Sequence, residues 1–300
     1  MSGLAAAHAL AGQGRTVTVF EARDRIGGRL WTDRSLGVPV DIGASWIHGT
    51  EGNPLTKLAD HLGLVRVTTE PTEVERGPDG QLVEHKGILA QLKAGGESWK
   101  ASMEIMAGAE YDQLNLWGYL FEEGYDGAEV LFPGGYVQIL DALKGDYEVR
   151  LGAAVQRIGL GSACVWVASG EVVGAFDAVV VTLPLGVLKR PDVVAFDPPL
   201  PKEKQAAIDR LGMGVLDKLC LLFDAPFWDR EAMWISTPDN GLPQGQCSVW
   251  LNLYKFTGTP ALMGFHGASA ARRVAEMSDE TLLGKALSVL DAAYPTDTSI

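Results

Sequence analysis

Short apolar runs alternate with segments of helical spacing along this chain of 300 residues. Residues 3–10 have the composition of a helix, and a β-branched strand is expected directly after them at 16–20. The unbroken β-branched run at 178–182 is typical of a parallel strand that is buried on both faces. A second apolar run, at 216–223, predicts a strand that carries one lysine. This alternation of helices and strands predicts an α/β fold.

The remaining pattern predicts further elements of both kinds. Helices are expected at 55–62, through most of 86–120, at 137–143, around 202–211 and from 278 to 294. Strands are expected at 65–69, 147–151, 164–168, 171–176, 247–253 and 261–266.

Charge and composition argue against several classes of protein. The net charge of −13 and the lack of a Lys/Arg cluster disfavour nucleic-acid binding. Cys164, Cys220 and Cys247 are far apart and form no CxxC pair, which argues against a disulfide framework and structural zinc. No apolar run reaches the roughly 20 residues of a membrane span, and the N-terminus lacks the features of a signal peptide. A soluble, cytoplasmic protein without a membrane partner is the resulting expectation.

The stretch at 16–48 carries the main candidate chemistry. Its strand ends on Glu21, and an acid at the C-terminal end of the second strand of a βαβ unit is placed to bind a ribose. Gly27 and Gly28 allow the backbone to approach a diphosphate, whose charge Arg29 can neutralise. This order of residues predicts a dinucleotide site.

Gly3 is placed as the last glycine of a dinucleotide-binding turn. Its distance to Glu21 suits the spacing of about 20 residues that such a unit has between this turn and its ribose acid. We therefore expect the first strand and the first glycines of the unit to be missing from these 300 residues. The alternative is that Met1 simply begins an unrelated helix.

The order of several motifs resembles the flavin-containing amine oxidase family, which includes monoamine oxidases, polyamine oxidases and flavin-dependent histone demethylases. The segments that carry this resemblance are Gly3-Leu4-Ala5-Ala6-Ala7, Val19-Phe20-Glu21-Ala22, Arg25-x-Gly27-Gly28-Arg29-x-x-Thr32 and Gly43-Ala44-x-Trp46-Ile47-His48-Gly49. The Trp46-Ile47-His48 variant, followed by Gly52-Asn53-Pro54, is most similar to the polyamine oxidase branch.

The resemblance implies an FAD cofactor and a role for each residue of these motifs. It places Gly3 in the turn, Glu21 at the adenosine ribose with Arg23 beside it, and Gly28 and Arg29 along the pyrophosphate. It places Gly43, Ala44, Ser45 and Trp46 close to the isoalloxazine, the backbone of Val155 at the adenine, and Thr182 at the end of a strand near the dinucleotide.

Two residues are implied on the catalytic side. Lys218 enters an apolar strand, which is costly unless its ammonium finds partners. The resemblance implies that Lys218 hydrogen-bonds a water that contacts flavin N5, whereas the alternative is a lysine that snorkels at a strand end. His48 either faces the substrate amine or is satisfied inside a turn, and the sequence leaves both alternatives open.

The resemblance also implies a division of the chain. A discontinuous, Rossmann-like FAD-binding domain is expected from 1–53 and 132–190, and a substrate domain of mixed sheet and helices from 54–131 and 191–300. Family members continue with an active-site aromatic pair and a Gly-Glu-x-Thr segment, which nothing here matches. The chain is therefore expected to be truncated at both ends and to bind FAD weakly, because backbone donors for the pyrophosphate are missing.

The implied function is FAD-dependent oxidation of a small-molecule amine, with a polyamine favoured. A hydride equivalent passes to flavin N5, the imine hydrolyses, and O2 reoxidises the flavin to give H2O2. One alternative is another double-glycine flavoprotein, such as an amino-acid oxidase or a desaturase-like enzyme. A second alternative is a truncated, non-catalytic fragment or pseudoenzyme. The sequence does not indicate an oligomeric state.

Overall fold

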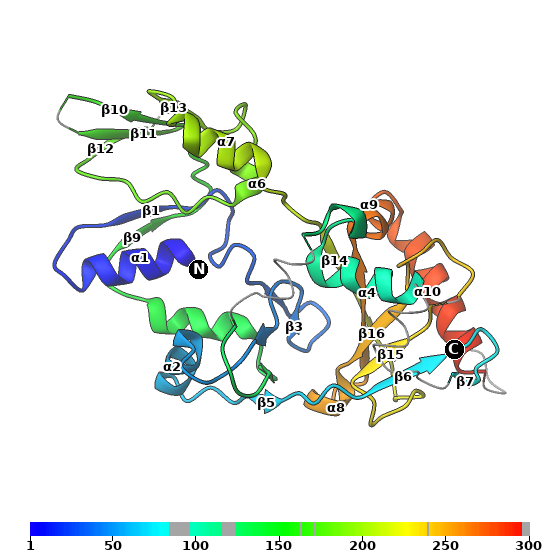
Figure 1. Ribbon diagram of the computed structural model, residues 1–300. Helices are drawn as coiled ribbons and strands as arrows, with labels where there is room; N and C mark the ends of the chain where they lie inside the picture. The colour runs from blue at the N-terminus through cyan, green and yellow to red at the C-terminus, as the bar shows by residue number, and fades with distance from the viewer. Residues whose placement is uncertain (84–96, 116–123, 163, 171, 239, 296–300) are drawn as a thin grey trace.

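The computed structural model describes residues 1–83, 97–115, 124–162, 164–170, 172–238 and 240–295. In Figure 1 the elements gather in two groups. The N-terminal group surrounds helix α1 (Ser2–Ala11), and the C-terminal group surrounds helix α10 (Asp279–Ala293). Each group has its own hydrophobic core, so the two are described in turn.

The N-terminal group is built on a parallel pair of strands. Strand β1 (Thr18–Phe20) runs beside β9 (Glu148–Arg150), as the sequence predicts for both segments. Helix α1 packs against β1 and against η2 (Tyr136–Leu143), which is the helix predicted at 137–143 and has 3-10 geometry. The wider Rossmann-like arrangement stays a prediction. The core of this group includes Leu4, Leu30, Ile47, Ala59, Ile139 and Leu140.

Helix α2 (Pro54–His61) also packs in this core, against η2. It begins at Asn53, whose side-chain oxygen accepts the N–H of Leu55 at 3.0 Å and so caps the helix. The predicted division of the chain gives α2 to the substrate domain, and that division stays a prediction.

Two small sheets hold the motif region of residues 29–48 on this core. One is the antiparallel pair of β2 (Thr32–Asp33) and β3 (Val40–Asp41). The other has β8 (Val130–Leu131) in the middle, with β4 (Trp46–Ile47) on one side and β5 (Val67–Thr68) on the other. Buried side chains on these strands fix the path of the motif region.

A separate sheet extends the N-terminal group. Its strand order is β12 (Val172–Phe176), β11 (Val165–Ser169), β10 (Arg157–Leu160) and β13 (Ala195–Asp197). The strands predicted at 164–168 and 171–176 are confirmed as β11 and β12, which pair antiparallel. Helix α6 (Leu185–Leu188) comes between β12 and β13 along the chain, helix α7 (Lys202–Arg210) comes after β13, and both lie beside the sheet in Figure 1.

The predicted buried strand at 178–182 is wrong. No strand is assigned there, and the side chains of Val180 and Val181 are 60% and 42% exposed. β-branched residues favour an extended backbone, but a strand persists only where a neighbour satisfies its N–H and C=O groups. None of the described strands pairs with this segment.

The C-terminal group is built on one larger sheet. Its described strands follow the order β14 (Leu216–Leu222), β17 (Ala261–Gly267), β16 (Val249–Asn252), β15 (Trp234–Ser236), β6 (Glu73–Arg76) and β7 (Leu82–Val83). The predicted strand with one lysine is confirmed as β14, and its pairing with β17 sets Lys218 opposite Phe265.

Helices surround this sheet in Figure 1. They are α4 (Glu97–Ala107), α8 (Tyr254–Thr257), α9 (Ala268–Ala275) and α10, with the 3-10 turn η1 (Tyr111–Gln113) after α4. The helix predicted from 278 to 294 is confirmed as α10, and Ser278 caps it, because its hydroxyl accepts the N–H of Thr281 at 3.2 Å. Within the described ranges, no helix has the length and apolar character needed to cross a membrane.

Candidate functional site

Lys218 joins the two groups of elements. It lies on β14 of the C-terminal group, and its ammonium donates to three oxygens of the 41–45 loop in the N-terminal group. The distances from Nζ are 2.9 Å to the backbone oxygen of Asp41, 2.5 Å to that of Gly43 and 2.8 Å to Ser45 Oγ. An ammonium has three N–H donors, so this loop uses all of them. The snorkelling alternative does not describe this half-buried side chain.

Burial lowers the pKa of the Lys218 amine to about 8, while the charge of Asp41 opposes the change. A pH only slightly above neutrality is therefore enough to give a substantial fraction of the neutral amine. That form has two N–H donors and one lone pair, so it can accept a hydrogen bond where the ammonium cannot.

The loop that receives Lys218 is tightly packed against the preceding backbone. The N–H groups of Gly43 and Ala44 donate to the oxygens of Trp31 and Arg29, each at 3.1 Å. A Cβ atom at Gly43 would lie 2.0 Å from the Arg29 oxygen, so only glycine fits at this position. The structure thus connects the predicted isoalloxazine residues directly to Arg29, the predicted pyrophosphate residue.

The side chain of Asp41 links this loop to two neighbouring segments. Its carboxylate accepts the Thr32 hydroxyl at 2.5 Å and the Tyr136 N–H at 3.0 and 3.1 Å. Burial raises the pKa of the Asp41 carboxyl, although the hydrogen bonds from Thr32 and Tyr136 oppose that rise. Asp41 is not among the predicted site residues, and the only sequence signal for it is its place two residues before Gly43.

Four ring side chains extend from Lys218 across the sheets. Trp46 stacks on Trp234, with ring centroids 6.0 Å apart, and Trp234 meets Phe265 edge-on at 5.6 Å. Lys218 Nζ lies 5.2 Å from the centre of the Phe265 ring, and His48 stacks on Trp46 at 6.2 Å. We call Phe265, Trp234, Trp46 and His48 the aromatic row. Neither Trp234 nor Phe265 has a local sequence signal, because only strand pairing brings them to this place.

His48 forms the far end of the aromatic row. Its Nδ1 lies 2.6 Å from Glu129 Oε2, and the two side chains are 74% and 47% exposed. His48 is therefore not enclosed in a turn. The sequence reasoning missed Glu129, which lies 81 residues away along the chain and becomes a neighbour through the pairing of β4 with β8.

The predicted nucleotide residues meet at the start of α1. The terminal ammonium of Met1 donates to the Gly27 oxygen at 3.3 Å. The charges of Glu21 and Arg29 both act on this end of α1. The first turn of α1 has no side-chain cap, and the space at the Cβ position of Gly28 is open. An uncapped helix start beside an arginine and an open glycine fits a diphosphate.

Other predicted cofactor residues lie around this point. Glu21 Oε1 accepts the Arg23 N–H at 2.9 Å, which fixes the carboxylate at the end of β1. A Cβ atom at Gly3 would lie 3.1 Å from Thr182 Oγ1, so these two residues are neighbours. The N–H of Ala153 donates to the backbone oxygen of Glu21 at 2.8 Å. Val155, two residues further along the chain, is half-buried. Their contacts with a nucleotide, and the strength of FAD binding, stay predictions.

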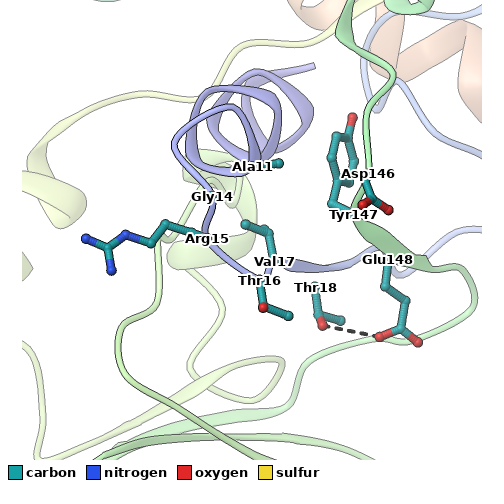
Figure 2. A pocket seen from close by; sticks show the side chains of 9 residues that line it. All are labelled: Ala11, Gly14, Arg15, Thr16, Val17, Thr18, Asp146, Tyr147 and Glu148. Atoms are coloured by element: carbon teal, nitrogen blue, oxygen red, sulfur yellow. Dashed lines mark hydrogen bonds between the residues drawn. The ribbon is translucent and has the colours of Figure 1, made fainter.

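Two of the surface cavities among the described residues lie in the N-terminal group. Figure 2 shows one of about 380 Å³ between the end of α1 and residues 146–148, where Thr18 donates to Glu148 Oε2 at 3.2 Å. The other measures about 270 Å³ and lies beside Leu4 and Leu140. Neither is lined by a predicted cofactor or catalytic residue, so we assign the site from the contacts above. Among the described residues, no group of three or more His, Cys, Asp or Glu is arranged to hold a metal.

Comparison with known proteins gives consistent matches over nearly the whole chain. A family model described as flavin containing amine oxidoreductase matches residues 1–106 and 96–299. Polyamine oxidase 4 of Oryza sativa subsp. japonica is 30% identical, with 99% of this chain and 72% of the relative covered. Polyamine oxidase 3 of the same organism is 32% identical, with 98% and 72% covered.

A more distant relative and a solved structure extend these matches. Lysine-specific histone demethylase 1 homolog 2 of Arabidopsis thaliana is 28% identical, over 98% of this chain and 46% of the relative. The structure of cyclohexylamine oxidase from Brevibacterium oxydans superposes with a TM-score of 0.75 at 25% identity, covering 98% of this chain and 79% of that protein.

Proposed function

This chain belongs to the flavin-containing amine oxidoreductase family, and we propose that it oxidises a polyamine along the aromatic row. As a member of this family it has the α/β flavoprotein fold, an FAD cofactor and an oxidoreductase activity on small-molecule amines. The choice of amine, the path of the hydride and the roles of single residues are parts of the proposal.

The observation that carries the proposal is the contact of Lys218 with the 41–45 loop. This contact places strand β14 of the larger sheet against the residues that we assign to the isoalloxazine edge. The aromatic row begins beside the same lysine, at Phe265. Aromatic faces attract cationic nitrogens and also pack against methylene groups. A polyamine presents both in alternation, which supports it over an amine with a single nitrogen.

FAD, when bound, supplies the redox chemistry: a hydride equivalent leaves the carbon next to the amine nitrogen for N5, the imine hydrolyses, and O2 regenerates the oxidised cofactor with release of H2O2. The residues of this chain position the amine for that step. The aromatic row holds the methylene chain, and the His48 imidazole binds an amine N–H.

We propose that Lys218 acts in two ways. As an ammonium it holds the 41–45 loop through its three hydrogen bonds. As a neutral amine it donates only two hydrogen bonds, and its lone pair can then accept a hydrogen bond from a water in the site. The pKa of about 8 makes this second form accessible in mildly alkaline solution.

The monoamine cyclohexylamine is the second candidate substrate, because the superposed structure is that of a cyclohexylamine oxidase. The experiment that separates the two uses the FAD-loaded protein under anaerobic conditions. Spermidine, spermine, cyclohexylamine and an amino acid are each added while the flavin absorbance is followed. We expect rapid bleaching with the polyamines, and stoichiometric H2O2 when air is admitted. If cyclohexylamine bleaches the flavin faster, the polyamine assignment is wrong, and if no amine bleaches it, the proposed activity is wrong.

A further inference from the structure

We propose that Glu129 is the positioning residue of His48. It holds the imidazole in the tautomer that has its proton on Nδ1, and so leaves Nε2 as an acceptor for the substrate amine. This inference rests on the proposed function only in supplying an amine for Nε2. The contact between the two side chains is a property of the chain itself.

Strand register places the two residues opposite each other. In the antiparallel pair of β4 and β8, Ile47 faces Val130, so the next pair along the ladder is His48 and Glu129. Side chains directly opposite on one face of such a pair are about 5 Å apart at their Cβ atoms. The hydrogen bond of 2.6 Å between Nδ1 and Oε2 follows from this register.

The backbone of Glu129 is also fixed. Its backbone oxygen accepts the N–H of Thr69 at 2.8 Å and the hydroxyl of Thr69 at 3.2 Å, where the chain leaves β5. Thr69 is only 5% exposed. The backbone that carries the carboxylate is therefore anchored between two strands, although the carboxylate itself faces solvent.

The partner chemistry determines the tautomer. An ionised carboxylate only accepts hydrogen bonds, so Nδ1 must donate the proton in this contact. In the neutral imidazole the second nitrogen, Nε2, then carries a lone pair. The stacking of the ring on Trp46, with 25° between the planes, fixes the plane in which that lone pair points. Tautomer and ring plane are thus set by two different neighbours.

Exposure makes this role separable from folding. Ion pairs between exposed side chains contribute little to stability, and here both side chains are largely exposed. Truncation of Glu129 should therefore leave the fold unchanged while it frees the imidazole to rotate and to exchange tautomers.

The test compares three variants of the full chain with the wild type. Glu129→Ala removes the acceptor, and Glu129→Gln keeps an acceptor oxygen but removes the charge. Asp126→Asn is the matched control, because Asp126 is an exposed acid on the same segment. The first readout is the ¹⁵N chemical shifts of the His48 ring, assigned with His48→Gln, which report the tautomer without substrate or turnover.

We expect one predominant Nδ1–H tautomer in the wild type and in Glu129→Gln and Asp126→Asn, and a mixture in Glu129→Ala. In the FAD-loaded protein, Glu129→Ala should lower kcat/KM for the amine about tenfold, the effect of one lost hydrogen bond in the reacting complex. Glu129→Gln should restore most of this loss. In a His48→Ala background, Glu129→Ala should cause no further loss, because both residues act as a unit.

Several outcomes would overturn the inference. A tautomer mixture in the wild type contradicts it directly, whatever the activity. A Gln variant as poor as the Ala variant means that the carboxylate acts through its charge and not by positioning. Additive losses in the His48→Ala background mean that Glu129 acts independently. Failure of the proposed function is distinct from all of these, because the wild type would then show the Nδ1–H tautomer but no flavin bleaching with any amine.

Discussion

The two ends of the aromatic row hold their polar groups in different ways. At one end Lys218 is half-buried and its ammonium donates to three oxygens of a single loop. At the other end His48 is 74% exposed and has Glu129 as its acceptor. The lysine is fixed by burial and several hydrogen bonds, whereas the histidine is fixed by strand register and one stacked ring.

This difference determines whether a substitution changes the stability of the fold or the rate of the reaction. Loss of a buried polar partner leaves unsatisfied groups and costs stability, whereas loss of an exposed partner exposes groups that water can satisfy. Substitutions at the lysine end should therefore affect folding and cofactor binding together. Substitutions at the histidine end should affect the reaction with little effect on folding.

Gly43→Ala should have the largest effect. Its Cβ would lie 2.0 Å from the Arg29 oxygen, so the loop that receives Lys218 must move. We expect a loss of about 3 kcal/mol in the free energy of unfolding, measured by urea denaturation, together with weaker FAD binding. Gly284→Ala is the control, since its Cβ position is open on α10 and the change should be neutral or stabilising. Equal effects of the two substitutions would contradict the proposed role of Gly43 in holding the loop.

Lys218→Met should lower the free energy of unfolding by about 2 kcal/mol, because it leaves two loop carbonyls and the Ser45 hydroxyl without their donor. Lys255→Met is the matched control, because Lys255 also donates to a hydroxyl and a backbone oxygen, at 2.8 and 2.7 Å, but at an exposed site. We expect the control to cost less than about 1 kcal/mol. Protection of the 41–45 amides from hydrogen exchange should fall in the first variant alone.

The stability contributed by Lys218 should depend on pH. Burial lowers its pKa in the folded chain from 10.5 to about 8. Between these two values the unfolded chain binds more protons at this site, so the free energy of unfolding rises with pH relative to that of Lys218→Met. We expect a relative gain of about 1 kcal/mol from pH 8 to pH 10.5, after allowing for solvent screening of a half-buried amine. A constant difference between the two unfolding curves would show that the pKa is not lowered.

Glu129→Ala should have the smallest effect on stability, less than about 1 kcal/mol in the free energy of unfolding, because its contact with His48 is exposed. Thermal unfolding of the variant beside the wild type measures this. A large drop in the midpoint would mean that the histidine end, like the lysine end, is part of the structural core, and the contrast between the two ends would be lost.

Local patterns in the sequence predicted what depends on local physics. The segment at 216–223 reads as an apolar strand with one costly lysine, and β14 is that strand. The helix after Asn53 and the cap at Ser278 are also local features, and both are present. The same reasoning failed at 178–182, because β-branched composition specifies extended backbone but not a pairing partner.

The candidate site depends on contacts that no local pattern encodes. The order of the motifs was sufficient to assign Gly43 and Lys218 to the same predicted flavin site. It did not show that the two residues are in contact. Trp234 and Phe265 join the row only through the pairing of strands in the larger sheet, and Glu129 reaches His48 only through β8. Such residues are ordinary aromatic and acidic residues in the sequence, so a single sequence gives no reason to select them.

The sequence separation between Lys218 and Gly43 has a consequence for biosynthesis. Their hydrogen bond joins residues 175 positions apart, and contacts of such long range form late because the closure of long loops costs chain entropy first. On the ribosome, the 41–45 loop is made long before its lysine emerges. The three hydrogen bonds from Lys218 to this loop can form only once β14 has docked, so in the order of synthesis the 41–45 loop is completed by a strand of the second core.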